Sequence, residues 1–107
     1  MIKNIKEIPQ NISGIYKINY DNGKIYIGQA INIRNRANEH NSKNYYPCDV
    51  ALKKYDAILT VLEEITDFSL LDEREKYYIK KYNATEKNIG YNLLTGGNAS
   101  GKRGIEN

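Results

Sequence analysis

A carboxylate stands on the apolar face of a helix-like segment in the last third of the chain. The residues at helical spacing on that face are Leu71, Glu75, Tyr78, Ile79 and Tyr82. Carboxylates are rarely buried unless they pair with a cation or bind a metal ion. Glu75 is therefore expected to be either a metal ligand or one half of an internal salt bridge.

A second segment places two more polar groups on an apolar face. Arg36 and His40, four residues apart, share the stripe of Ile33 and Ala37. Each alone has an ordinary explanation, because a core histidine is commonly hydrogen-bonded and an arginine at the edge of a stripe can extend its charged head into water. Inward polar groups on two helices together indicate a site.

An arginine, a histidine, a carboxylate and tyrosines in one cleft fit the hydrolysis of a phosphodiester. The guanidinium can bind phosphate oxygens in bidentate fashion and offset the charge of the transition state. One carboxylate with water molecules can hold Mg²⁺, which keeps most of its hydration shell. A tyrosine or histidine can then accept a proton from the attacking water. These residue types predict a hydrolase that uses one metal ion.

Hydrophobic periodicity and turn signals give the elements that must position these residues. Two segments rich in Ile and Tyr, joined by Asp21-Asn22-Gly23, predict a β-hairpin, and a compact apolar run predicts a third strand. The predicted strands are residues 14–20, 24–29 and 58–65, and the predicted helices are residues 31–41, 49–55 and 69–82. Ser69 is expected to cap the last helix. Residues 1–12 are expected to precede the first regular element.

Length and composition are those of one ordinary globular domain. The 107 residues are 40% hydrophobic and 27% charged, and the net charge of +3 mildly favours a polyanionic partner without deciding it. No apolar run reaches the roughly 20 residues of a membrane span. Cys48 is the only cysteine, so an intrachain disulfide and a metal cage made of several cysteines are excluded. It is expected to be a small packed residue. A single cysteine also favours a reducing, cytoplasmic setting. The predicted domain covers residues 1–94, and the Gly-rich residues 95–107 are expected to form a flexible tail or linker.

Two tripeptides in the predicted hairpin carry a family resemblance. Gly14-Ile15-Tyr16 and Tyr26-Ile27-Gly28 resemble the two motifs that name the GIY-YIG nucleases. The family pattern continues in the same order with an Arg, a His, a Glu and an Asn, and this chain has Arg36, His40, Glu75 and Asn92 in those places. The resemblance covers residues 13–94. It implies an α/β domain of the α+β type, with a three-stranded antiparallel sheet flanked by helices.

The resemblance also implies roles for the tyrosines, the arginine and the histidine. Tyr16 and Tyr26 would line the site, and Tyr16 in preference to Tyr26 would position or deprotonate the attacking water. Because a phenol has a pKa near 10, a neighbouring cation would have to stabilise the phenolate. Arg36 would hold the scissile phosphate. His40 would act as a proton shuttle or as a hydrogen-bond partner to a tyrosine.

The remaining implied roles concern the metal and the end of the domain. Glu75 would bind the ion, in preference to Glu73, which lies on a different helix face. Asn92 would fix local geometry or contact DNA, and a turn residue that closes the last strand is an equal alternative. Gly28 would permit the close approach of backbone or phosphate.

Together these inferences predict a metal-dependent DNA endonuclease with one Mg²⁺ or Mn²⁺ ion per site. Residues 91–104 resemble the segment that joins the catalytic domain of phage and intron homing endonucleases to a DNA-binding region, so the chain is expected to be either such a catalytic part or a freestanding nuclease. Three further possibilities remain as alternatives: the chain forms a transient homodimer, a C-terminal DNA-binding domain accompanies it, and it is encoded by a phage or mobile element. The alternative function is a nucleic-acid-binding or repair-complex module that has the same fold and does not cleave.

Overall fold

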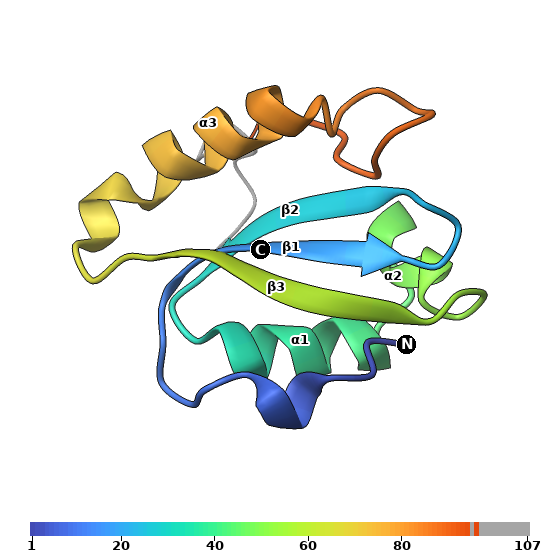
Figure 1. The fold of residues 1–107 in the computed structure, drawn as a ribbon, viewed down its shortest axis with the longest axis horizontal. Coiled ribbons are helices and arrows are strands. Elements are labelled where there is room, and N and C mark those ends of the chain that lie inside the picture. Colours follow the sequence, from blue (N-terminus) through green and yellow to red (C-terminus); the bar gives the residue numbers. More distant parts are fainter. Residues whose placement is uncertain (95, 97–107) are drawn as a thin grey trace.

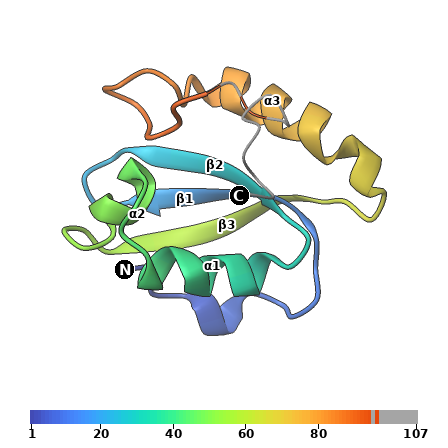
Figure 2. The same ribbon diagram turned by 180° about the vertical axis from the view of Figure 1, so that it is seen from behind.

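The computed structural model describes residues 1–94 and 96, which contain one three-stranded antiparallel sheet. The strands are β1 (Gly14–Tyr20), β2 (Ile25–Ala30) and β3 (Ala57–Glu64), and β1 lies between the other two. Helices lie on both sides of this sheet (Figure 1, Figure 2). The prediction of an α+β domain with a three-stranded antiparallel sheet flanked by helices is confirmed.

The central strand is buried on both faces. Ile15 packs into the apolar cluster on the α3 side of the sheet, whereas Tyr16 and Ile18 pack into the cluster on the α1 side. This alternation is the ordinary two-residue period of a strand. Because β1 also has a neighbouring strand along each edge, these three side chains are at most 1% exposed. A tyrosine at this place in the strand is therefore removed from water.

The two longer helices cover opposite faces of the sheet (Figure 1). They are α1 (Ile33–Ser42) and α3 (Leu71–Tyr82). The side chain of Asn32 caps α1 by accepting a hydrogen bond from the Asn35 amide at 3.1 Å, which satisfies one of the free donors at the helix start. Among residues 1–94 and 96, no helix is long and apolar enough to cross a bilayer.

The start of α3 differs from the prediction. Ser69 does not cap this helix but lies in a short 3₁₀ turn, η2 (Phe68–Leu70), that precedes it. Asp67 caps this turn, because its carboxylate accepts from the Ser69 amide at 3.1 Å and from the Ser69 hydroxyl at 2.6 Å. The regular helix follows the turn, begins at Leu71 and has no side-chain cap of its own.

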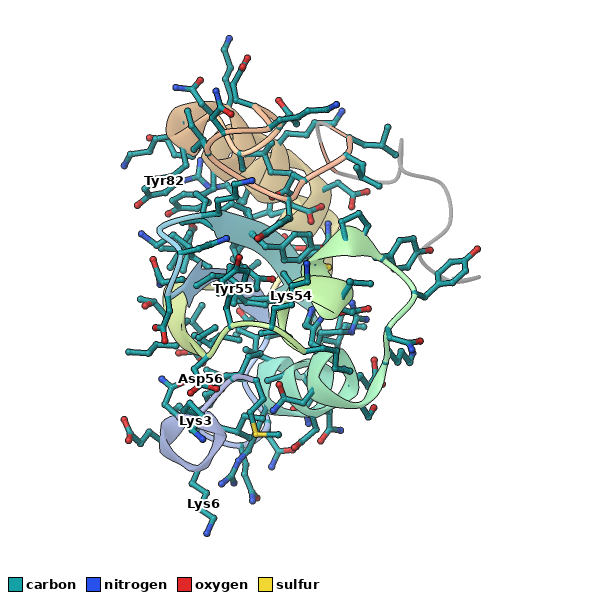
Figure 3. The ribbon with its side chains drawn as sticks, turned by 90° about the vertical axis from the view of Figure 1, so that its right-hand side faces the viewer. Lys3, Lys6, Lys54, Tyr55, Asp56 and Tyr82 are labelled. Atoms are coloured by element: carbon teal, nitrogen blue, oxygen red, sulfur yellow. The ribbon has the colours of Figure 1, made fainter. Side chains whose placement is uncertain are left out.

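The short second helix also has different bounds. The prediction of residues 49–55 is wrong, because α2 covers Pro47–Ala51. Proline suits the first turn of a helix, where its missing N–H has no partner to lose. After Leu52 the chain runs in turns into β3, and Tyr55 and Asp56 lie in this connection (Figure 3). The shift brings Cys48 into the helix and places Asp49 in its first turn, and both residues are buried.

The N-terminal residues contribute to the core more than was predicted. A 3₁₀ turn, η1 (Ile5–Glu7), lies within them, and the Lys3 amide donates to the Ala57 carbonyl at 2.9 Å at the start of β3. Ile2 and Ile8 are 2% and 4% exposed. Isolated isoleucines among polar residues show no regular period, so the pattern could not reveal this packing.

Candidate active site

A pocket of about 420 Å³ opens where α1, α2, the middle of α3 and the segment after α3 meet the sheet. All six residues that were predicted to form the site line this pocket, namely Tyr16, Tyr26, Arg36, His40, Glu75 and Asn92. They come from four different elements and from the segment after α3. The structure thus brings together residues that are up to 76 positions apart, from 16 to 92, around one volume large enough for a phosphodiester group.

Tyr16 lines the pocket, and the neighbouring strand β2 has a glycine, Gly28, next to its side chain. Tyr16 pairs with Gly28 of β2, and a Cβ atom at Gly28 would overlap the Tyr16 phenol. The space at Gly28 was predicted to admit backbone or phosphate, but it is filled by this phenol. The glycine of one motif therefore positions the tyrosine of the other.

A chain of two buried hydrogen bonds extends from this phenol. The Tyr16 hydroxyl lies 2.7 Å from Nε2 of His40, and Nδ1 of His40 lies 2.6 Å from Oδ1 of Asp49. A carboxylate can only accept, so Nδ1 carries a proton and donates it to Asp49. In the neutral imidazole Nε2 is then unprotonated and accepts from the Tyr16 hydroxyl. Asp49 thus fixes the tautomer in which His40 can receive a proton from Tyr16.

Asp49 was not predicted as a site residue. It is 3% exposed, and its place in the sequence beside Pro47 and Cys48 gives no periodic signal. When the helix was taken to begin at residue 49, an acid there matched an ordinary first-turn residue and needed no further explanation. A buried carboxylate requires a partner, and that partner is His40 on the preceding helix.

The electrostatics of the pocket oppose ionisation of its tyrosines. Burial raises the pKa of the Tyr16 phenol well above its ordinary value, and the positive charge of Arg36 offsets only part of this effect. Burial likewise raises the pKa of Tyr26. The Arg36 guanidinium is partly exposed and its Nε lies 3.1 Å from Glu39 on the same helix. Arg36 is thus a partly exposed cation that lines the pocket beside the Tyr16 phenol.

Glu75 projects into the same pocket from α3. It is 8% exposed, and its Oε1 accepts a hydrogen bond from Nε2 of Gln29 at 2.8 Å. The same Gln29 nitrogen donates to Oδ1 of Asp72 at 2.8 Å. One amide at the end of β2 therefore contacts two carboxylates of α3, of which Glu75 lines the pocket. Gln29 and Asp72 were not predicted, because an amide at the end of a strand and an acid in a first helical turn are common without any site.

A comparison with protein families identifies this arrangement. The model described as the GIY-YIG catalytic domain matches residues 12–89. The chain belongs to the GIY-YIG family. The matched region contains five of the six predicted residues, and Asn92 lies just beyond it. Comparison with curated proteins and with solved structures gave no match.

Membership in the GIY-YIG family indicates a nuclease-type function with DNA as the substrate, and nucleases of this family are generally metal-dependent. The residues of this GIY-YIG domain fit a hard divalent ion such as Mg²⁺. Glu75 supplies a carboxylate at the pocket wall, and the Gln29 bridge brings the Asp72 carboxylate near it. Oxygen ligands with space for coordinated water are what Mg²⁺ requires.

Asn92 binds the backbone of the GIY-YIG sheet at two points. Its Oδ1 accepts from the Ile27 amide at 2.9 Å, and its Nδ2 donates to the Ile27 carbonyl at 2.8 Å. The segment that leads to Asn92 runs along the edge of β2, with the Tyr91 amide donating to the Ile25 carbonyl at 2.9 Å. The side chain therefore replaces a missing strand partner in the middle of the YIG motif.

The predicted linker of this GIY-YIG chain, residues 95–107, lies outside the described residues except for Gly96.

Proposed function

We propose that this chain is a metal-dependent DNA endonuclease that hydrolyses phosphodiester bonds with one Mg²⁺ or Mn²⁺ ion per active site. The observation that carries the proposal is the Tyr16–His40–Asp49 chain of buried hydrogen bonds in the pocket that Arg36 and Glu75 also line. Family membership supports the reaction class.

Tyr16 and His40 act together as the general base. Transfer of the Tyr16 proton to Nε2 of His40 leaves a phenolate, which accepts a proton from the attacking water. The imidazolium formed in this transfer is stabilised by Asp49 at Nδ1. Arg36 lowers the cost of the phenolate, because its positive charge acts on the Tyr16 oxygen.

Arg36 and Glu75 act on the phosphate. Arg36 lines the pocket and is partly exposed, so its guanidinium can exchange Glu39 for two oxygens of the scissile phosphate. Glu75 would hold the divalent ion, which would supply Lewis-acid stabilisation of the charge that develops during hydrolysis. Asn92 keeps β2 and the segment after α3 in register and so positions Tyr26 and Gly28.

We propose further that one copy of the domain cuts one strand, since it has one such set of residues. Cleavage of both strands would then need two events or two copies. The placement in a homing endonuclease rests on the resemblance of residues 91–104, most of which lie beyond the described part of the chain.

Cleavage of supercoiled plasmid and of single-stranded DNA, with Mg²⁺, Mn²⁺ or EDTA, tests the proposal. Arg36→Ala and Glu75→Ala are each expected to lower the rate by about a hundredfold or more, the usual effect of removing one transition-state stabiliser. Glu73→Ala is the matched control, because Glu73 is an exposed acid of the same helix. Folded wild-type protein that binds DNA and cuts neither substrate would favour the non-cleaving module.

A further inference from the structure

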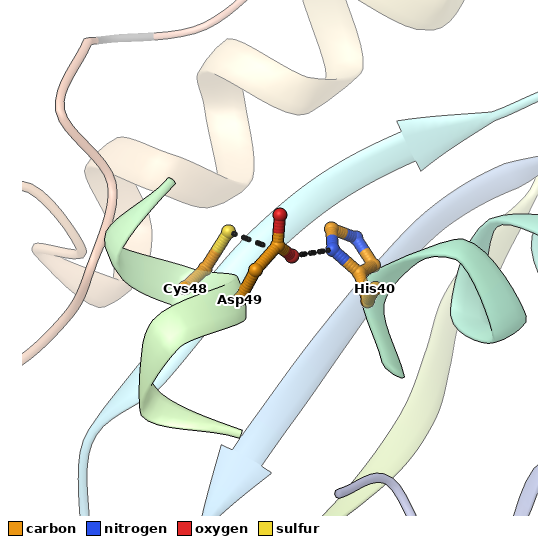
Figure 4. A group of neighbouring side chains, drawn as sticks. All are labelled: His40, Cys48 and Asp49. Carbon is orange, nitrogen blue, oxygen red and sulfur yellow. Dashed lines mark hydrogen bonds and ion pairs between the residues drawn. The ribbon is translucent and has the colours of Figure 1, made fainter. Parts of the chain in front are cut away.

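Cys48 has no part in the proposed reaction, yet its thiol lies beside His40 and Asp49. These two residues belong to the Tyr16–His40–Asp49 chain of hydrogen bonds, hereafter the relay. Its Sγ is 3.7 Å from Oδ1 of Asp49, and the same oxygen is 2.6 Å from Nδ1 of His40. Figure 4 shows the Asp49 carboxylate between the thiol and the imidazole ring. The sulfur, nitrogen and oxygen atoms lie within 4.8 Å of one another.

We propose that His40, Cys48 and Asp49 form a binding site for a thiophilic divalent ion such as Zn²⁺, and that an ion bound there inhibits the nuclease. The binding site stands on this geometry alone. The inhibition rests on the proposed function, because it acts through His40.

The distances suit a tetrahedral ion. With ordinary Zn–S, Zn–N and Zn–O bond lengths, ligand atoms around Zn²⁺ lie about 3.3 to 3.6 Å apart. The Cys48–Asp49 separation of 3.7 Å is already close to this value, and the His40–Asp49 contact of 2.6 Å must open by less than about 1 Å. The His40 and Cys48 ligand atoms, which lie within 4.8 Å of each other, must approach by no more than about 1.2 Å. All three residues line the pocket, so an ion can enter and a water molecule can occupy the fourth position.

Charge and ligand softness separate this site from the one at Glu75. A thiolate and a carboxylate together neutralise a divalent ion, so the filled site carries no net charge in a place where each side chain is at most 7% exposed. Thiolate and imidazole favour Zn²⁺ and related ions, whereas Mg²⁺ favours oxygen ligands. Mg²⁺ is therefore not expected to compete for the His40–Cys48–Asp49 site.

The bound ion would block the relay by changing the tautomer of His40. An ion on Nδ1 displaces the proton that Nδ1 donates to Asp49, and the neutral imidazole then carries its proton on Nε2. The Cys48 thiol releases its proton to solvent as the thiolate binds. With Nε2 protonated, His40 donates to the Tyr16 oxygen and can no longer receive the Tyr16 proton.

Titration of the full chain with Co²⁺ tests binding without any need for nuclease activity. Tetrahedral Co²⁺ with a thiolate ligand gives visible bands and a sulfur-to-metal charge-transfer band, and both are expected at one ion per chain. Cys48→Ser, which is nearly the same size, and Cys48→Ala should both abolish the charge-transfer band, and Glu75→Ala should retain it. Absence of the band in folded wild-type protein, or its persistence in both Cys48 variants, would overturn the site.

Zn²⁺ added to cleavage reactions that contain excess Mg²⁺ tests inhibition. The wild-type chain is expected to lose activity, whereas both Cys48 variants keep their basal rate and require at least about tenfold more Zn²⁺ for the same loss. Raising Mg²⁺ should not restore the wild-type rate. Relief by Mg²⁺, or equal sensitivity of the variants, would place the inhibitory ion at Glu75 and overturn the inference. If the wild-type chain binds Co²⁺ through sulfur and does not cleave DNA, the proposed function fails and the metal site stands.

Discussion

Replacement of Asp49 by asparagine tests whether the buried carboxylate acts on the reaction through His40. Asparagine has the same shape, and its Oδ1 can still accept the Nδ1 proton, so the fold is expected to survive. What is lost is the negative charge 2.6 Å from the imidazole. That charge has its largest effect when the Tyr16 proton has moved to His40 and the ring is an imidazolium.

The magnitude follows from the geometry. A hydrogen bond to a charged group contributes about 1.5 to 3 kcal/mol, and the neutral bond that asparagine keeps contributes about 0.5 to 1.5 kcal/mol, so about 1 to 1.5 kcal/mol is lost. Since about 1.4 kcal/mol corresponds to a tenfold change in rate, Asp49→Asn is expected to slow cleavage by about 5- to 10-fold. If the asparagine NH₂ turns toward Nδ1, the tautomer is reversed and the rate falls further.

The assay is single-turnover cleavage of plasmid DNA at saturating Mg²⁺ as a function of pH, accompanied by urea unfolding. Asp21→Asn removes the same charge from an exposed turn and should leave the rate and the pH profile unchanged. In Asp49→Asn the pH profile should change shape, which a purely structural defect would not produce. A folded Asp49→Asn chain with a rate within about twofold of wild type, a difference of less than about 0.5 kcal/mol, would refute the role of Asp49.

Three other predictions concern the residues that position the relay. Gly28→Ala should displace the Tyr16 phenol and abolish most cleavage. Retention of the wild-type rate would contradict the inference that the close contact between Gly28 and Tyr16 positions this phenol. Asn92→Ala should lower the free energy of unfolding by about 2 to 4 kcal/mol, because both Ile27 backbone groups lose their partner, and urea denaturation measures this. Burial raises the pKa of Tyr16, Tyr20 and Tyr26, so the contribution of each phenol to stability is complete below about pH 10 and is lost as the pH rises further. The unfolded state then binds fewer protons, and stability should fall by about 1.4 kcal/mol per pH unit above pH 10 for each of the three phenols, so Tyr16→Phe should remove about a third of the tyrosine contribution.

The fold and most of the pocket could be predicted because their signals are periodic or lie in motifs. The hairpin has a turn with Gly23 at φ +89°, and α1 shows Ile33 and Ala37 at helical spacing. Glu75 could be found because an acid on an apolar stripe is anomalous. Each of these signals is contained in a short window of sequence.

The residues that were missed depend on contacts across the fold. Asp49 acquires its role only because α2 begins at Pro47 and turns the carboxylate toward His40 on another helix. Gln29 becomes a bridge only because the end of β2 lies against α3. Ile2 reaches the core through a bridge to Ala57, 55 residues away. No local period encodes these contacts, because each is fixed by the packing of elements that are distant in sequence.

Burial of Tyr16 opposes the phenolate, yet the same burial explains why a relay is needed. Ionisation of a phenol that is removed from water has a high free-energy cost, and burial raises the pKa of Tyr16 for this reason. The proposed transfer to His40 would keep the proton within a pair that is neutral overall, and the new ion pair would lie between Arg36 and Asp49, which would stabilise its two ends. Burial also strengthens those interactions, since the local dielectric constant is low. In the proposed mechanism, the Asp49 carboxylate behind His40 is therefore what would allow Tyr16, at the centre of the sheet, to serve as a base near neutral pH.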